Sequence, residues 1–413
     1  MWTIGAFRKI LPTIFFICQQ QSVYCTSRFI LFKFGEFRYI QPMASRMITE
    51  AVNIHYTPFL KAHEKIIDIF KSATPASVLI IESKGNRFAW KVCDHEVDGL
   101  DCGKKKIQNE YAFLQKQKAP FTKVYETREC GGFWGFSMPY HQIPTLRACL
   151  DKPLTTLYLP SILDTLKRDF WQQATSKPDL EFVTRNLVEK TLRRLDALEK
   201  LSSKCPSDLA WFPKQIAFKW VILNGIVCQN PREILSHWST SQSVISALMP
   251  HRVGAGHGDF SPANMLIDLS NAAEPVTLID PHGINIKPGD RSPTLDCSKL
   301  AWYLHGAFEI RTGKVYAVTA VSGDILCNNP SDISRVAAYD DLCHWAYSAA
   351  LFQTEQHPVW NIPQRLAMMA ALYDLLETNN RAHMGEWQQA ATFWVVGTQR
   401  INALHQHINP AKT

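Results

Sequence analysis

The amino-acid sequence predicts an α+β fold with two lobes, a small β-rich lobe followed by a large helical lobe. Residues 64–146 contain short apolar or alternating runs that are typical of strands, together with one amphipathic helix. From about residue 150 the pattern changes to long stretches with helical periodicity, and one strand-like pair lies where the two patterns meet. A small sheet followed by a helical region predicts a ligand-binding cleft between the lobes.

The expected domains follow this change of pattern. We expect residues 1–46 to form a leader or disordered segment, residues 47–142 an N-lobe with a five-stranded sheet and one helix, and residues 143–413 a helical C-lobe. The N-lobe strands are predicted at 66–70, 78–82, 88–92, 123–126 and 133–138, with the helix at 104–117 and tight turns at 83–86 and 131–132. The C-lobe helices are predicted at 154–173, 179–201, 331–353, 359–378 and 383–407, and the strand-like pair at 264–268 and 276–279.

The formal net charge of +7 does not indicate a nucleic-acid-binding surface. Residues 1–46 hold six basic residues and one acidic residue, whereas the remainder holds 38 basic and 36 acidic residues, so the body of the protein is nearly neutral. We therefore expect no nucleic-acid partner. No apolar run approaches the roughly 18 residues that cross a bilayer, so we also expect no stable membrane insertion.

The cysteines and the N-terminal segment bear on the cellular compartment. The 11 cysteines are scattered and contain no C-x-x-C pair, which favours a reducing, cytoplasmic location without a zinc knuckle or a redox dithiol. Residues 10–18 resemble the apolar core of a signal peptide, but Pro12 interrupts the run and no A-x-A cleavage site follows. We favour a dispensable leader, with Met43 or Met47 as a usable start.

The strand-like pair carries the residues that decide the functional interpretation. The sequence reads H-G-D-F-S-P-A-N-M-L at 257–266 and L-I-D-P at 278–281. Phosphoryl transfer needs a carboxylate that orients the attacking hydroxyl and accepts its proton, and oxygen ligands that hold Mg²⁺ against the phosphates. Asp259 and Asn264, five residues apart on one turn, can supply the base and one metal ligand, and Asp280 can supply a second ligand.

This stretch resembles the catalytic loop of the aminoglycoside phosphotransferase and choline kinase superfamily, whose members are relatives of the protein kinases. The pattern H-G-D-x-x-x-x-N, followed by a hydrophobic strand and I-D, is specific, and the resemblance extends over about residues 64–310. It implies a protein-kinase-like fold with ATP and Mg²⁺ as cofactors, Asp259 as the catalytic base, and Asn264 and Asp280 as the Mg²⁺ ligands. It also implies that His257 braces the loop. The alternative is a chance turn, with Asp280 as a capping or surface carboxylate.

The N-lobe supplies a second part of the expected site. Lys91 lies in the predicted strand 88–92, F-A-W-K-V, which resembles the V-A-I-K strand of the protein kinases. In such enzymes the lysine contacts the phosphates and pairs with a glutamate on the next helix, and Glu110 lies 19 residues on, within the predicted helix. The alternative for both side chains is an ordinary solvated charge.

Two further segments resemble nucleotide-binding parts of the superfamily. No G-x-G-x-x-G loop precedes Lys91, but the segment between the first two strands carries Ser72, Thr74 and Ser77, whose hydroxyl and backbone N–H groups can meet phosphate. Met138 and Tyr140 lie where the superfamily has a hinge that holds adenine by main-chain hydrogen bonds. An ordinary polar turn and plain core packing are the respective alternatives.

The segment after Asp280 favours a small acceptor. Only 15 residues separate Asp280 from Asp296 and no A-P-E sequence follows, whereas a protein kinase needs a longer activation segment to hold a peptide. Asp296 precedes a helical run and is expected to cap it, although in the superfamily an acidic residue here also braces the catalytic loop. The candidates for the acceptor site, by position alone, are His282, Asn285, Asp290 and Arg291.

The sequence leaves the identity of the acceptor open. Residues 151–250 hold 13 basic and 10 acidic residues, which mildly disfavours a polycationic aminoglycoside, and a sugar or polyol is preferred over an amino alcohol. The stretch 281–300, including the D-x-x-K-L helix start, is also similar to phosphotransferases of bacterial surface-polysaccharide pathways. The leading hypothesis is an ATP-dependent phosphotransferase acting on a hydroxyl of a small molecule. The alternative is a pseudokinase or nucleotide-binding scaffold without turnover, and no oligomeric state is predicted.

Overall fold

The chain forms two compact units, Met1–Ile66 and Ile67–Thr413. In the first unit the described elements are the 3-10 helix η1 (Thr57–Phe59) and the beginning of β1 (Glu64–Lys71). The expected leader, residues 1–46, lies outside the described residues. The computed structural model describes residues 55–71, 76–94, 103–149, 153–268, 270–271, 274–282, 290–307, 310, 318–321, 324–327, 338–349, 351–352 and 361–408.

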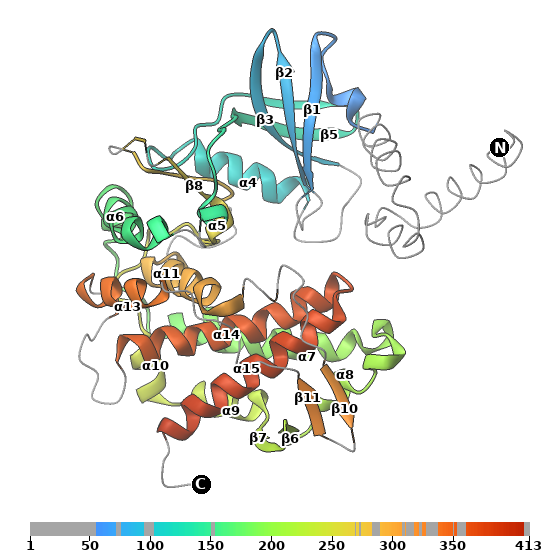
Figure 1. The fold of residues 1–413 in the computed structure, drawn as a ribbon, viewed down its shortest axis with the longest axis vertical. Coiled ribbons are helices and arrows are strands. Elements are labelled where there is room, and N and C mark those ends of the chain that lie inside the picture. Colours follow the sequence, from blue (N-terminus) through green and yellow to red (C-terminus); the bar gives the residue numbers. More distant parts are fainter. Residues whose placement is uncertain are drawn as a thin grey trace, which may run out of the picture. The chain divides into compact units, whose positions relative to one another are not determined.

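A five-stranded sheet with one helix forms the N-lobe, as the sequence predicts (Figure 1). The strand order is β1-β2-β3-β5-β4, and the pairs β2–β3, β3–β5 and β4–β5 are antiparallel. The elements after β1 are β2 (Ser77–Ser83), β3 (Asn86–Asp94), α4 (Lys104–Leu114), β4 (Thr127–Cys130) and β5 (Phe133–Pro139). Lys84 and Gly85 between β2 and β3 have φ values of 51° and 79°, as a two-residue hairpin turn requires.

One predicted N-lobe strand is wrong. Residues 123–126 are not a regular strand, and β4 begins at Thr127 instead. The segment still runs beside β5, because the Tyr125 N–H donates to the Ser137 carbonyl and the Ser137 N–H donates to the Glu126 carbonyl, each at 2.9 Å. The segment is therefore bonded to β5 at Tyr125 and Glu126, but it does not form a continuous strand ladder.

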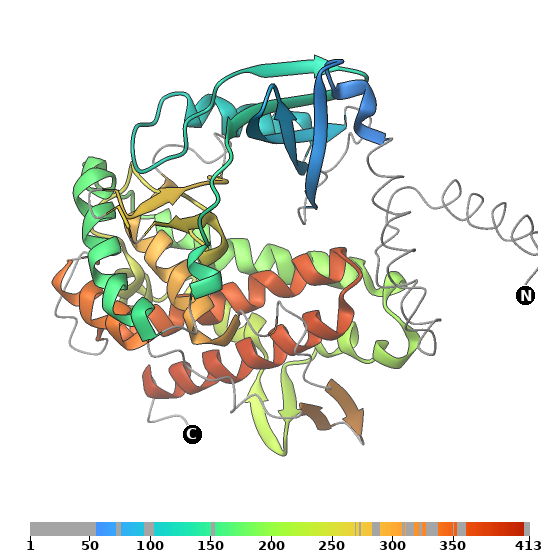
Figure 2. The same cartoon turned by 45° about the horizontal axis from the view of Figure 1, so that its top comes forward.

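Helices dominate the C-lobe, as predicted. The two longest, α14 and α15, lie side by side in both views (Figure 1, Figure 2). They approach closely at Gly397, where a Cβ would lie 2.9 Å from two carbon atoms of Leu375. The helices are α5 (Leu146–Cys149), α6 (Pro153–Asp169), α7 (Glu189–Lys200), α8 (Phe212–Gln215), α9 (Pro231–Trp238), α10 (Gln242–Leu248), α11 (Pro293–Trp302), α13 (Ala338–Ser348), α14 (Ile362–His383) and α15 (Trp387–Ile408). Within the described part of the chain, none of the helices is both long enough and apolar enough to cross a membrane.

The expectation of one strand-like pair in the C-lobe is wrong, because a four-stranded sheet is also present. Its order is β10-β11-β6-β7. The turn between β6 and β7 is Asn224-Gly225, with φ values of 51° and 76°, and Asn-Gly between apolar runs is a strong hairpin signal that the sequence prediction missed. The strands are β6 (Trp220–Leu223), β7 (Ile226–Gln229), β10 (Val318–Val321) and β11 (Asp324–Cys327).

The predicted pair in the C-lobe forms a hairpin of β8 (Met265–Ile267) and β9 (Val276–Leu278). It is joined to the segment that follows α4, because the Thr122 N–H donates to the Leu278 carbonyl at 2.9 Å and the Leu278 N–H donates to the Pro120 carbonyl at 2.7 Å. These bonds connect the helical lobe to the sheet lobe beside the predicted catalytic loop. The two-lobed α+β, kinase-like fold class predicted from the sequence is confirmed.

Candidate active site

The loop before β8 brings the predicted base and one predicted metal ligand together. The amide nitrogen of Asn264 donates to the Asp259 backbone carbonyl at 2.9 Å and to Asp259 Oδ2 at 3.2 Å. Gly258, which precedes the aspartate, has a φ of 81°, a backbone conformation that favours glycine. Because Asn264 donates with its nitrogen toward Asp259, its Oδ1 is left as the atom that can accept or bind a cation.

Two buried residues brace this loop. Asp296 accepts the backbone N–H groups of His257 and Gly258 at 2.7 and 2.9 Å, and the indole N–H of Trp171 at 3.0 Å. The His257 ring stacks on Phe121 and places Nε2 2.9 Å from the Ile279 carbonyl. The bracing role that the resemblance implied for Asp296 is therefore seen in the structure.

The helix cap predicted at Asp296 is wrong. Ser292 is the N-cap of α11, and its hydroxyl accepts the Thr294 N–H at 3.1 Å. Asp296 lies one turn further into the helix, 1% exposed, where it points at the loop rather than at its own helix terminus. The sequence favoured the cap because an acidic residue before an apolar helical run is a common N-terminal signal.

Two of the acceptor candidates chosen by position are structural instead. Arg291 is 5% exposed, donates to the Gly256 carbonyl at 2.6 Å, and lies over the Phe113 ring at 4.2 Å. Asp290 accepts hydrogen bonds from Arg185 and Asn186 at 2.9 and 3.1 Å. These hydrogen bonds, buried for Arg291 and part-buried for Asp290, leave the two side chains little freedom to bind a substrate.

Of the other two acceptor candidates, Asn285 and His282, only His282 is among the described residues. Asn285 lies outside the described residues. His282 is exposed and lies near Asp259. Partial desolvation, with Lys106 and Lys299 nearby, lowers its pKa below the ordinary value although Asp259 opposes the shift. His282 remains a candidate that can meet a polar acceptor.

The N-lobe lysine reaches the predicted metal ligand of the C-lobe. Lys91 Nζ lies 2.6 Å from Glu110 Oε2 and 2.6 Å from Asp280 Oδ1. The Lys91 and Glu110 side chains are only 6% and 2% exposed, whereas Asp280 is 42% exposed. Asp280 follows β9 with a φ of 55°, an uncommon conformation for a residue with a side chain and one that is enriched at functional sites.

One buried ammonium thus serves two carboxylates, and the pKa values reflect this. Burial lowers the pKa of Lys91, but Asp280 and Glu110 outweigh burial and hold it above its ordinary value. Burial raises the pKa of Glu110 to about 7 despite the attraction of Lys91. Burial likewise raises the pKa of Asp280, but Lys91 outweighs it and holds this pKa below its ordinary value.

Three further lysines surround the site, and the sequence prediction did not assign them a role. Lys299 on α11 forms an ion pair with Asp259, and the two side chains are 21% and 34% exposed. Burial raises the pKa of Asp259, but Lys299 outweighs it and holds this pKa well below its ordinary value. Lys106 on α4 and Lys190 on α7 act electrostatically on His282 beside it. A signal for Lys299 was available, since it lies three residues after Asp296 and so on the same helix face.

The remaining predicted nucleotide contacts are only partly described. Ser72 and Thr74 lie outside the described residues, and Ser77 begins β2, 6% exposed. Met138, 8% exposed, pairs with Ala89 of β3 in the sheet. Tyr140 follows β5 directly and is half-buried. These residues are placed in the N-lobe near the strand that carries Lys91, and their roles stay predictions.

The oxygen atoms near Asp259 fit Mg²⁺ better than a transition metal. Mg²⁺ is commonly held by one or two protein oxygens together with phosphate and water oxygens, and Asn264 Oδ1 with Asp280 Oδ2 is such a set. Among the described residues, no group of three or more His, Cys, Asp or Glu side chains could hold a metal by itself. Asn264 and Asp280 would supply two of the ligands of such an ion, and phosphate and water oxygens would supply the others.

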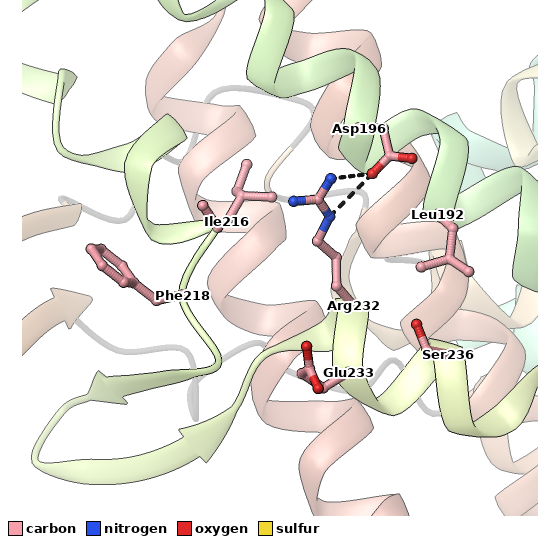
Figure 3. Close-up of a pocket in the computed structure, with 8 residues that line it drawn as sticks. Leu192, Asp196, Ile216, Phe218, Arg232, Glu233 and Ser236 are labelled. Carbon is pink, nitrogen blue, oxygen red and sulfur yellow. Dashed lines mark hydrogen bonds and ion pairs between the residues drawn. The ribbon is translucent and has the colours of Figure 1, made fainter.

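A surface depression of about 390 Å³ lies elsewhere in the C-lobe (Figure 3). It is lined by residues of α7 and α9 and by the segment after α8. Arg232 in its wall is already paired with Asp196 and, at 3.4 Å, with Glu199. None of the predicted site residues lines this depression, so we assign it no part in the site.

Comparisons with known proteins give limited information. No protein-family model and no curated protein matches the chain. Among solved structures, the fold is similar to "Putative fructosamine-3-kinase from Haemophilus somnus 129PT", with a TM-score of 0.44 and 10% sequence identity over 86% of this chain and 94% of that chain. A similarity at this level carries no argument about function, which has to be drawn from the site itself.

Proposed function

We propose that the protein transfers the γ-phosphoryl group of Mg²⁺-bound ATP to a hydroxyl of a small molecule. The observation that carries this proposal is the convergence of Asp259, Asn264 and Asp280 with the ammonium of Lys91. These groups come from a loop, the end of a hairpin and a strand of the other lobe. A base, two metal ligands and a phosphate-binding cation are the parts that phosphoryl transfer requires.

In the proposed reaction each side chain has one role. Asp259 orients the acceptor hydroxyl and takes its proton, and its hydrogen bond from Asn264 fixes the carboxylate. Asn264 and Asp280 would hold Mg²⁺, which would supply neutralisation of the phosphate charge. Lys91, held by Glu110, binds phosphate oxygens, because a nucleotide can replace Asp280 as its second anionic partner.

The charge around the site favours a neutral or anionic acceptor. Lys106, Lys190 and Lys299 all act on His282 next to Asp259, so three cations lie near the proposed base. A polycationic aminoglycoside would be repelled there. A sugar or polyol hydroxyl is therefore our preferred acceptor class.

An acceptor screen tests this proposal. The protein is incubated with Mg²⁺ and ATP and with sugars, polyols, amino alcohols and aminoglycosides in turn, and ADP release is measured against Asp259→Asn. We expect release that depends on one acceptor class and is lost in the variant. ATP binding without turnover for any class would instead support the alternative of a nucleotide-binding scaffold.

A further inference from the structure

Lys299 holds an unusual position for a lysine of a structural helix. Its ammonium pairs with Oδ1 of Asp259, the proposed base, while Asp296 on the same face of α11 holds the backbone of the loop. One helix therefore fixes both the loop and a cation beside the base. The Lys299 side chain is 21% exposed, so the ammonium is also accessible to a ligand.

Stability does not account for this contact. A partly exposed lysine–carboxylate pair contributes little to folding, because water solvates both charges well and the long side chain loses rotamer freedom. The pair also has a chemical cost, since a cation beside a carboxylate makes that carboxylate a weaker base. A cation kept beside a base despite this cost suggests a use in the reaction itself.

The loop has no cation of its own. Between Asp259 and Asn264 the residues are Phe260, Ser261, Pro262 and Ala263, none of which carries charge. The ion pairs of Lys91 are with Glu110 and Asp280 rather than with the base. The transferred phosphoryl group nevertheless spreads negative charge over three oxygens in the transition state, and a cation next to the base stabilises that charge.

We propose that Lys299 Nζ contacts the γ-phosphoryl group of ATP and follows it from the nucleotide to the acceptor. This inference rests on the proposed function. The acceptor oxygen forms a bond to the γ-phosphorus, the bond to the bridging oxygen breaks, and its electron pair leaves with ADP. The hydroxyl proton passes to Asp259, whose neutralised carboxyl group releases the ammonium, and Lys299 stays protonated throughout.

Nucleotide binding tests this contact without a known acceptor. The dissociation constants of Mg²⁺–AMP-PNP and Mg²⁺–ADP are measured by titration calorimetry for the wild type, Lys299→Met and Lys299→Arg. The methionine variant keeps most of the length of the side chain and removes its charge. We expect the methionine variant to lose roughly ten-fold in affinity for AMP-PNP and less than two-fold for ADP. The arginine variant should keep most of the wild-type affinity for AMP-PNP, because it keeps the positive charge. Lys214→Met, on the exposed face of α8, is the matched control and should change neither constant.

The outcomes separate the two proposals. Equal losses for both nucleotides, or no loss for either, would overturn the contact between Lys299 and the γ-phosphoryl group. If the wild type binds neither nucleotide, the proposed function fails and this inference fails with it. The thermal midpoint of each variant is compared with that of the wild type, and Lys299→Gln replaces the methionine variant if the latter does not fold.

Discussion

Two lysine–carboxylate pairs in this molecule look alike in chemistry and differ in their surroundings. Lys91 and Glu110 in the N-lobe are 6% and 2% exposed. Lys299 and Asp259 in the C-lobe are 21% and 34% exposed. The first pair joins a strand to a helix inside the sheet lobe, and the second joins a helix to the predicted catalytic loop.

The difference in exposure predicts that the Lys91–Glu110 pair stays closed, whereas the Lys299–Asp259 pair can open. Removing one partner of a buried pair leaves an uncompensated charge away from water, which is strongly destabilising. Opening a partly exposed pair costs little, because water solvates both groups. We therefore expect the buried Glu110 to hold Lys91 in place through a catalytic cycle, while the exposed Asp280 gives way to the nucleotide and Asp259 releases Lys299.

The largest effect is expected when the proposed base, Asp259, is removed from the more exposed Lys299–Asp259 pair. Asp259→Asn should lower kcat by roughly 10²–10⁴-fold, because the amide cannot accept the acceptor's proton. The dissociation constant for Mg²⁺–ATP should change little, since Lys91 and Asp280 remain. Asp268→Asn is the matched control, because the Asp268 carboxylate accepts hydrogen bonds from the N–H and the hydroxyl of Ser270 in an exposed turn away from the site. Unchanged turnover in the Asp259 variant would remove the assignment of the base.

The next largest effect is expected when the buried Lys91–Glu110 pair is broken. Lys91→Met should lower the free energy of unfolding by about 3–5 kcal/mol, because Glu110 and Asp280 lose their shared cation. Adding Glu110→Gln should recover part of that loss, since one uncompensated charge is removed. Denaturant titrations of the single and double variants measure both effects. Lys104→Met, which breaks the exposed pair with Glu129 in the same lobe, is the control and should cost less than about 1 kcal/mol.

The contribution of His257, which braces the catalytic loop, to the free energy of unfolding should depend on pH. Burial lowers the pKa of His257 from 6.5, and the nearby Asp296 and Asp259 oppose the shift without cancelling it. The unfolded chain therefore binds a proton that the folded chain does not, so stability is present above pH 6.5 and is lost as the pH falls. The loss attributable to this residue is at most about 1.4 kcal/mol per pH unit. His257→Gln should flatten the dependence of the unfolding free energy on pH between 7.5 and 5.5, and an unchanged slope would contradict the assignment.

The smallest effect is expected for the stability of the exposed pair. Lys299→Met should change the free energy of unfolding by no more than about 1 kcal/mol, because both partners are open to water. Denaturant titration beside Lys91→Met gives the comparison directly. A loss of stability as large as that of Lys91→Met would show that both ion pairs stabilise the fold equally. Stability would then be enough to account for the Lys299–Asp259 contact.

Much of the fold was predictable because it depends on local signals. The turn at Lys84-Gly85 follows from residue types that set backbone angles within a few positions, and β8 and β9 follow from two short apolar runs close together in the chain. The sheet of β6, β7, β10 and β11 was missed for two reasons. The Asn224-Gly225 turn was overlooked, and the parallel pairing of β11 with β6 joins residues about a hundred positions apart.

The candidate site divides in the same way. Asp259 and Asn264 were predictable together because five residues of one loop can place them in hydrogen-bond contact. The acceptor candidates after Asp280 were chosen by position alone, and in the structure Arg291 makes a buried contact with the loop while Asp290 accepts from Asn186 at a part-buried position. Position along the chain does not reveal whether a polar side chain faces a substrate or a neighbouring backbone.

By itself, the sequence determined the order of the lobes, the local geometry of the loop and the residue types that phosphoryl transfer needs. Only the tertiary structure decided that Lys91 meets Asp280, 189 residues away, and that Lys299 of α11 meets Asp259. The physical reason is that local backbone preferences act over a few residues. Contacts between distant charges exist only where packed helices and strands hold them together against the entropy of the chain.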